Sequence, residues 1–231
     1  MMNKMMKKYP LFIGMGFMIV MIAVIIGAVN TANSAAYYAV EKGTRDTSVS
    51  LAQLRASIES TVIWLPYFKF LGLAMILAGI TMALGVISLR LENLGKEVMS
   101  SVPAGARQTL PGRPRSAMLM RLFMMLGMMI ILIGFLVALS ASRTAVTVFS
   151  NPIMVIDAAA SGSSLLAGLA SVHAAEAWLE AFKFVGIAFF FLGIINGLST
   201  VIFALKYQQT AIPEVVDHLP AGAVPVPAVG D

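Results

Sequence analysis

Long apolar stretches alternate with polar connections along the 231-residue chain. Four of these stretches, at about residues 10–29, 70–89, 118–139 and 184–205, are almost free of charged side chains. Each holds roughly twenty residues, the length that a helix needs to cross the hydrocarbon core of a bilayer. The pattern therefore predicts an all-α integral membrane protein with four transmembrane helices.

The two longer polar connections each contain a short segment with apolar residues at helical spacing. In the first, Ser48 or Ser50 can cap a helix whose apolar face is made by Leu51, Leu54, Ile58 and Val62. A counterpart precedes the fourth apolar stretch. We expect these segments to form short amphipathic helices in the outer connections, on the membrane surface or against the bundle. Pro66 then suits the first turn of the second transmembrane helix.

The second half of the chain repeats the first. At an offset of 114, residues 50–91 match residues 164–205 at 15 of 42 positions, and at an offset of 111 Gly16 matches Gly127. Shared hydrophobicity alone does not align Trp, Lys and Gly. We predict two tandem two-helix repeats, residues 1–117 and residues 118–231, the second with a Pro-rich tail. The matched positions include Trp64/Trp178, Phe68/Phe182, Lys69/Lys183, Phe70/Phe184, Gly72/Gly186 and Gly79/Gly193.

Basic residues are distributed unequally between the two ends of the apolar stretches. The amino terminus, the central linker and the start of the tail hold ten, whereas the two outer connections hold four. The positive-inside rule then places both termini in the cytoplasm, so that the repeats insert in parallel into a cell (inner or cytoplasmic) membrane. The ten are Lys4, Lys7, Lys8, Arg90, Lys96, Arg107, Arg113, Arg115, Arg121 and Lys206; the four are Lys42, Arg45, Arg55 and Arg143.

Composition narrows the function classes. Hydrophobic residues make up 59% of the chain and charged residues 12%, with a mean hydropathy of +0.88. The net charge of +5 gathers beside the apolar stretches, where a bilayer explains it, so we expect no nucleic-acid partner. The absence of cysteine excludes disulfides, thiolate metal sites and thiol nucleophiles.

Lys69 and Lys183 occupy equivalent positions beside the second and fourth apolar stretches, five residues after Trp64 and Trp178. One interpretation is a pair of cations that binds an anion or a lipid headgroup. The other is anchoring at the water–lipid boundary, where lysine extends its amine toward water and tryptophan lies at headgroup level. The lengths of the stretches favour anchoring. Glu180 lies three residues before Lys183, a spacing that allows an ion pair.

Small residues recur at helix-packing intervals in the apolar stretches. In lipid such residues let helix backbones approach closely, which increases their van der Waals contact. We expect the second and fourth transmembrane helices to pack through these faces, within the chain or against a partner. The candidate packing residues are Gly79 and Ala83, Gly193 and Gly197, and Gly127 with Gly134.

The sequence offers little chemistry at membrane depth. Met120, Met124 and Met128 share a helix face and could in principle hold Cu(I), but no His or Cys accompanies them. The two histidines, His173 and His218, lie outside the apolar stretches, so haem ligation between helices is not expected. No set of residues resembles a catalytic constellation. We predict no enzyme activity and no cofactor.

Three functions stay open, of which a sensor or regulator is the third. The first is a non-catalytic structural, accessory or assembly subunit of a larger membrane complex, with the lipid bilayer and other membrane subunits, or a second copy, as partners. The second is a small transporter or channel for a solute or ion, because some transporters are built from parallel repeats. The scarcity of polar residues in the apolar stretches favours the subunit.

Overall fold

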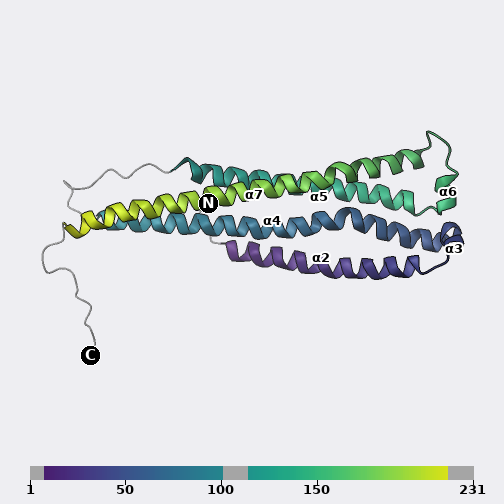
Figure 1. Ribbon diagram of the computed structural model, residues 1–231, viewed down its shortest axis with the longest axis horizontal. Coiled ribbons are helices and arrows are strands. Elements are labelled where there is room, and N and C mark those ends of the chain that lie inside the picture. The colour runs from purple at the N-terminus through teal and green to yellow at the C-terminus, as the bar shows by residue number, and fades with distance from the viewer. Residues whose placement is uncertain (1–7, 101–113, 218–231) are drawn as a thin grey trace, which may run out of the picture.

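The computed structural model describes residues 8–100 and 114–217. Within these ranges 92% of the residues are helical and none lies in a strand. The amino-terminal lysines Lys4 and Lys7, most of the central linker and the Pro-rich tail lie outside the described residues. The helices, shown in Figure 1, are α2 (Tyr9–Tyr38), α3 (Lys42–Thr47), α4 (Val49–Ser100), α5 (Arg115–Phe149), α6 (Ile153–Asp157) and α7 (Ser164–Asp217).

Four of the helices, α2, α4, α5 and α7, are long and apolar enough to cross a membrane. Each contains one of the four apolar stretches of the sequence, so the predicted all-α class and the four apolar helices are confirmed. α2 and α5, with 30 and 35 residues, come closest to the length that a bilayer requires, and α4 and α7 greatly exceed it. At about 1.5 Å of rise per residue, α4 and α7 are each roughly 80 Å long.

The amphipathic segments expected from the sequence are not separate helices. Residues 49–69 continue without a break into the apolar part of α4, and α7 is likewise continuous from Ser164. Pro66 consequently lies inside α4, where proline removes one helical hydrogen bond. Packing accounts for the difference, because Ala56 and Ile63 of this segment lie in an apolar cluster with Val148 of α5, while Val62 of the expected apolar face stays 52% exposed. The short helices of these two polar connections are α3 and α6 instead.

Serine caps begin the two longest helices. The Ser48 hydroxyl accepts a hydrogen bond from the backbone N–H of Leu51 at 3.4 Å, and Ser163 accepts one from Leu166 at the same distance. Each hydroxyl satisfies a backbone donor that has no partner within the helix. Ser48, one of the two caps expected from the sequence, is thus the cap of α4.

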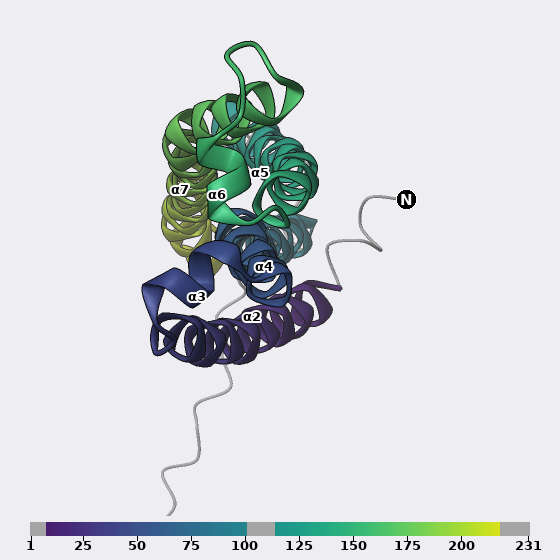
Figure 2. The ribbon, with the colours of Figure 1, turned by 90° about the vertical axis from the view of Figure 1, so that its right-hand side faces the viewer.

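The helices form an elongated bundle of two hairpins, α2 with α4 and α5 with α7 (Figure 1). α4 lies at the centre and packs against α2, α5 and α7, whereas α2 packs mainly against α4 alone. The end-on view in Figure 2 shows α2 at the edge of the bundle, and α3 and α6 over the end where the hairpins turn. The arrangement is therefore three packed helices with a fourth at one side.

The core is divided into three apolar clusters along the bundle. The cluster toward α6 is built around Ala56, Val148 and Phe149. The next contains Tyr67, Ala138 and Leu179. The third fills the space between the apolar parts of α4, α5 and α7 with Ala74, Leu77, Ala78, Ile131, Ile187 and Phe190.

Candidate functional site

Close backbone approaches between helices lie inside each hairpin and involve glycines. A Cβ atom at Gly16 of α2 would lie 2.5 Å from the carbonyl oxygen of Gly72 and 2.8 Å from Ile76. A Cβ atom at Gly127 of α5 would lie 2.9 Å from the carbonyl oxygen of Gly186 and 2.8 Å from Phe190. Only a residue without a side chain permits this approach. Gly72 and Gly186, which the sequence comparison matched but did not single out for packing, are therefore contact residues.

Gly79 and Gly193 make a second contact of this kind. A Cβ at Gly79 would meet Ile13 at 2.5 Å and the carbonyl oxygen of Tyr9 at 3.1 Å. One at Gly193 would meet the carbonyl oxygen of Met120 at 3.3 Å. These two glycines face α2 and α5, respectively, rather than joining α4 to α7. The contacting pairs in the two hairpins are related by the offsets 111 and 114 that relate the two halves of the sequence.

Gly197 and Ala83 lie farther along the same faces. A Cβ atom at Gly197 would lie 3.0 Å from Leu84 of α4 and 3.1 Å from the sulfur of Met120. Gly197 thus marks a direct approach of α7 to α4, as expected for the second and fourth apolar helices. Ala83, its counterpart in the first half, is half-buried.

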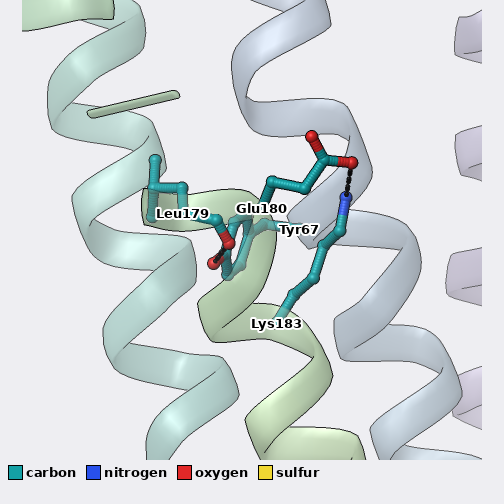
Figure 3. A network of polar contacts seen from close by, with 4 residues as sticks. All are labelled: Tyr67, Leu179, Glu180 and Lys183. Atoms are coloured by element: carbon teal, nitrogen blue, oxygen red, sulfur yellow. Dashed lines mark hydrogen bonds and ion pairs between the residues drawn. The ribbon is translucent and has the colours of Figure 1, made fainter. Parts of the chain in front are cut away.

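Tyr67 joins the two hairpins. Its side chain, only 2% exposed, lies against Gly134 of α5, where any added side chain would collide with the ring. Its hydroxyl donates a hydrogen bond to the carbonyl oxygen of Leu179 in α7 (Figure 3). One side chain of α4 therefore contacts both helices of the second hairpin. Sequence reasoning selected Gly134 for packing and did not select Tyr67, although the alignment of the two halves distinguishes it, because the matched position is Ala181.

Lys183 lies beside this contact, between α7 and α4. Its amine is 3.5 Å from the Glu180 carboxylate (Figure 3). The amine also lies 5.4 Å from the ring centres of Phe70 and Phe184. The lysine side chain is only 13% exposed, whereas that of Glu180 is 76% exposed. The cation is thus held against the faces of aromatic rings, an arrangement favoured by their electrostatic quadrupole.

Lys69 has a different environment from its counterpart. It is exposed, its amine lies near Gly27 of α2, and it makes no hydrogen bond or ion pair with any described residue. The structure therefore does not bring Lys69 and Lys183 together as one cationic site. Trp64 is half-buried and contacts Phe68, while Trp178 is 44% exposed and contacts Phe182.

Polar side chains within the apolar helices are bonded locally. Thr81 donates to the carbonyl oxygen of Leu77, and the Asn196 amide donates to that of Leu192, each one turn earlier in its own helix. Besides the Tyr67 hydroxyl, a few polar groups join two helices: the hydroxyls of Ser116 and Thr200 lie 2.8 Å apart, and the amides of Asn30 and Gln208 donate to the carbonyl oxygens of Ile58 and Leu91. Among the described residues these groups do not form a continuous polar stripe.

No described group of three or more His, Asp or Glu side chains could hold a metal ion. His173 and Glu176 form an isolated pair with 3.6 Å between nitrogen and oxygen. The methionine face considered for copper, Met120, Met124 and Met128, packs into the apolar core. Met120 is buried and Met124 and Met128 contact the apolar cluster between α4, α5 and α7, while Met125 is 68% exposed.

One polar groove lies toward the α6 end of the bundle, between α5 and α7. Its volume is about 550 Å³, and Arg143 is the only charged residue in its lining. Two of its polar residues already bond to the backbone of α5, Thr147 to the carbonyl oxygen of Arg143 and Asn151 to that of Thr147. The groove is therefore open and weakly equipped to select a ligand.

Comparisons of the chain with protein-family models, curated proteins and solved structures give no match. The fold and the contacts described above therefore carry the functional argument alone.

Proposed function

We propose that this protein is a non-catalytic structural or accessory component of a larger membrane assembly. In this proposal α2, α4, α5 and α7 cross a cell membrane, with both termini on the cytoplasmic side and α3 and α6 outside. The two hairpins are tandem repeats of one unit, inserted in the same direction.

The observation that carries the proposal is the nature of the interior between α4, α5 and α7. That space is filled by side chains such as Leu77, Ile131 and Phe190, the last two fully buried. Polar groups nearby bond to their own helices, as Thr81 does to the carbonyl oxygen of Leu77. A solute pathway generally needs intramembrane charge, broken helices or polar lining, so the packed interior favours a structural role over transport.

The length of the helices supports the same conclusion. If the apolar stretch of α4 lies in the bilayer, the part before Phe70 extends about 30 Å beyond its outer boundary. There Ala56, Val148 and Phe149 form an apolar core of their own, and the Arg55 guanidinium lies 4.7 Å from the Phe149 ring centre. A helical projection fixed to the membrane helices is a suitable docking element for neighbouring proteins.

The matching contacts support the repeat. Gly16 with Gly72 and Gly127 with Gly186 are the same interaction at positions that the sequence offsets relate. A chance resemblance between apolar helices has no reason to reproduce backbone approach at matched positions. The antiparallel helices within each hairpin also agree with parallel insertion of the two units.

The functional test combines purification with depletion. The tagged full-length chain is purified from its native membrane in mild detergent, and the chain is depleted in a parallel culture. We expect other membrane proteins to co-purify in a fixed ratio, and their assembled complex to decrease on a native gel after depletion. A chain that purifies without other proteins and moves a solute in proteoliposomes would instead establish the transporter alternative.

Orientation is tested separately with single cysteines, because the natural chain has none. Gly43→Cys and Ser161→Cys, both at exposed positions, should react with an impermeant reagent added outside. Ser161 is preferable to Gly162, whose φ of 80° favours glycine. Gly112→Cys, in the linker beyond the described residues, should react only after the membrane is opened. Labelling of all three from outside would contradict the proposed topology.

A further inference from the structure

The two matched lysines differ in how their positive charge is compensated. Lys183 is only 13% exposed, and the Glu180 carboxylate lies 3.5 Å from its amine. The position that matches Glu180 in the first half is Pro66, which has no carboxylate. Lys69 is exposed and makes no ion pair with any residue in the described ranges. The described part of the chain therefore supplies a counter-charge for Lys183 and none for Lys69.

The Lys69 amine lies where α4 meets α2. It is 3.8 Å from the position that a Cβ atom at Gly27 would take. Gly27 lies near the end of the first apolar stretch, and Lys69 directly precedes the second. Both helices thus place the amine at the same edge of the hydrocarbon core. Lipid headgroups begin at that edge, so their phosphate oxygens are the anionic groups within reach of the amine.

An exposed apolar strip continues from Lys69 into the membrane part of α4. It consists of Leu73, Ile80 and Ile87, which follow Lys69 at spacings of four, seven and seven residues. These spacings keep all four side chains on one face of the helix. The three apolar residues are 38%, 38% and 46% exposed. The face therefore presents a cation at the membrane boundary and apolar surface at membrane depth.

The matched face of α7 is covered by the protein itself. Ile187, the counterpart of Leu73, is 8% exposed and belongs to the apolar cluster between α4, α5 and α7. Ile194 packs against the same cluster, and Val201 is half-buried. In the second hairpin, charge compensation and apolar cover thus both come from the chain. In the first hairpin the matched lysine and the matched strip have neither.

We propose that this face of α4 binds one phospholipid molecule, with its headgroup phosphate on the Lys69 amine and an acyl chain along Leu73, Ile80 and Ile87. An ammonium group donates strong, charge-assisted hydrogen bonds to phosphate oxygens. A phospholipid is favoured over free phosphate because only the lipid also covers the apolar strip. The inference rests on the membrane insertion proposed above, and it names a lipid partner and the residues that hold it.

The first test gives Lys69 the counter-charge that its counterpart already has. Pro66→Glu places a carboxylate three residues before Lys69, the spacing of Glu180 and Lys183, so the new carboxylate competes with the lipid phosphate. Pro66→Ala is the matched control, because it removes the proline without adding charge. The full-length chains are purified in mild detergent and titrated with phosphatidylglycerol, and native mass spectrometry counts the bound lipid.

We expect the wild type and Pro66→Ala to bind the first phosphatidylglycerol molecule with similar dissociation constants, and Pro66→Glu to bind it roughly tenfold more weakly. Lys69→Gln should weaken binding to a similar extent, whereas Lys69→Arg should retain it. Lys42→Gln, at an exposed position of α3, controls for the general loss of one positive charge. Equal dissociation constants for Pro66→Glu and Pro66→Ala, or for Lys69→Gln and Lys42→Gln, would overturn the proposal.

The second test changes the probe. Diacylglycerol with the same acyl chains lacks the phosphate, and inorganic phosphate lacks the acyl chains, so neither should displace phosphatidylglycerol from the wild type at equal concentration. Displacement by either one would overturn the proposal. Membrane insertion is scored separately, by the resistance of the chain to alkaline extraction from native membrane. An extracted chain contradicts the proposed membrane function, whereas an inserted chain whose lipid binding is independent of Lys69 overturns this inference alone.

Discussion

The two hairpins share their internal packing and differ in their surroundings. In both, glycines bring the backbones together, Gly16 with Gly72 and Gly127 with Gly186. Yet α4 is covered on three sides by α2, α5 and α7, and 44% of the residues in its most apolar stretch are buried. In α7 the corresponding share is 28%, although the two helices match in sequence.

This difference teaches that residues at matched positions determine the packing inside each hairpin, whereas residues at unmatched positions determine how the hairpins join. Tyr67 has no counterpart in the second hairpin, and it makes the contact with Gly134 and Leu179. α5 thereby packs on α4, while α2 lies away from α7 at the edge of the bundle (Figure 2). Substitutions at matched and unmatched positions can therefore separate the two kinds of contact.

The largest effect is expected at Gly134, where the hairpins join. Gly134→Leu places a side chain where the Tyr67 ring lies, and overpacking of this kind destabilises by about 1–3 kcal/mol, here at the upper end. Thermal unfolding in detergent measures the loss. Gly14→Leu is the matched control, because nothing lies within 4 Å of a Cβ there. Equal melting temperatures for the two variants would refute the role of this contact.

An intermediate effect is expected inside each hairpin. Gly16→Leu and Gly127→Leu each push a side chain against a glycine carbonyl, so each should lower stability by roughly 1–2 kcal/mol, within the range for interhelical terms in membranes. The informative result is the similarity of the two losses, measured by the same unfolding assay against Gly14→Leu. If only one variant is destabilised, the hairpins are not equivalent in packing.

The smallest effect is expected from the hydroxyl of Tyr67. Tyr67→Phe keeps the ring against Gly134 and removes only the hydrogen bond to Leu179, which lowers stability by about 1 kcal/mol. The change should be well below that of Gly134→Leu. Tyr38→Phe, at a position 65% exposed, serves as the control. A loss as large as that of Gly134→Leu would mean that the hydroxyl, rather than the shape of the ring, joins the hairpins.

Much of the candidate site could be foreseen because spacing alone reveals close-packing residues. Gly79, Gly193, Gly127 and Gly134 all lie at close helix contacts. Their partners could not be foreseen, since a glycine indicates only that something approaches. The separate environments of Lys69 and Lys183 were also hidden, because they depend on which side of each helix is covered. For the same reason the continuity of α4 through Pro66 escaped prediction.

By itself the sequence determined the four apolar helices, their all-α class and the matched positions of the two halves, because these follow from local hydrophobicity and residue spacing. The tertiary structure alone decided which faces meet. Helix rotation and the fit of one ring beside Gly134 placed α5 against α4 and left α2 at the edge. Such choices depend on shape complementarity between residues distant in the chain, and no local pattern encodes them.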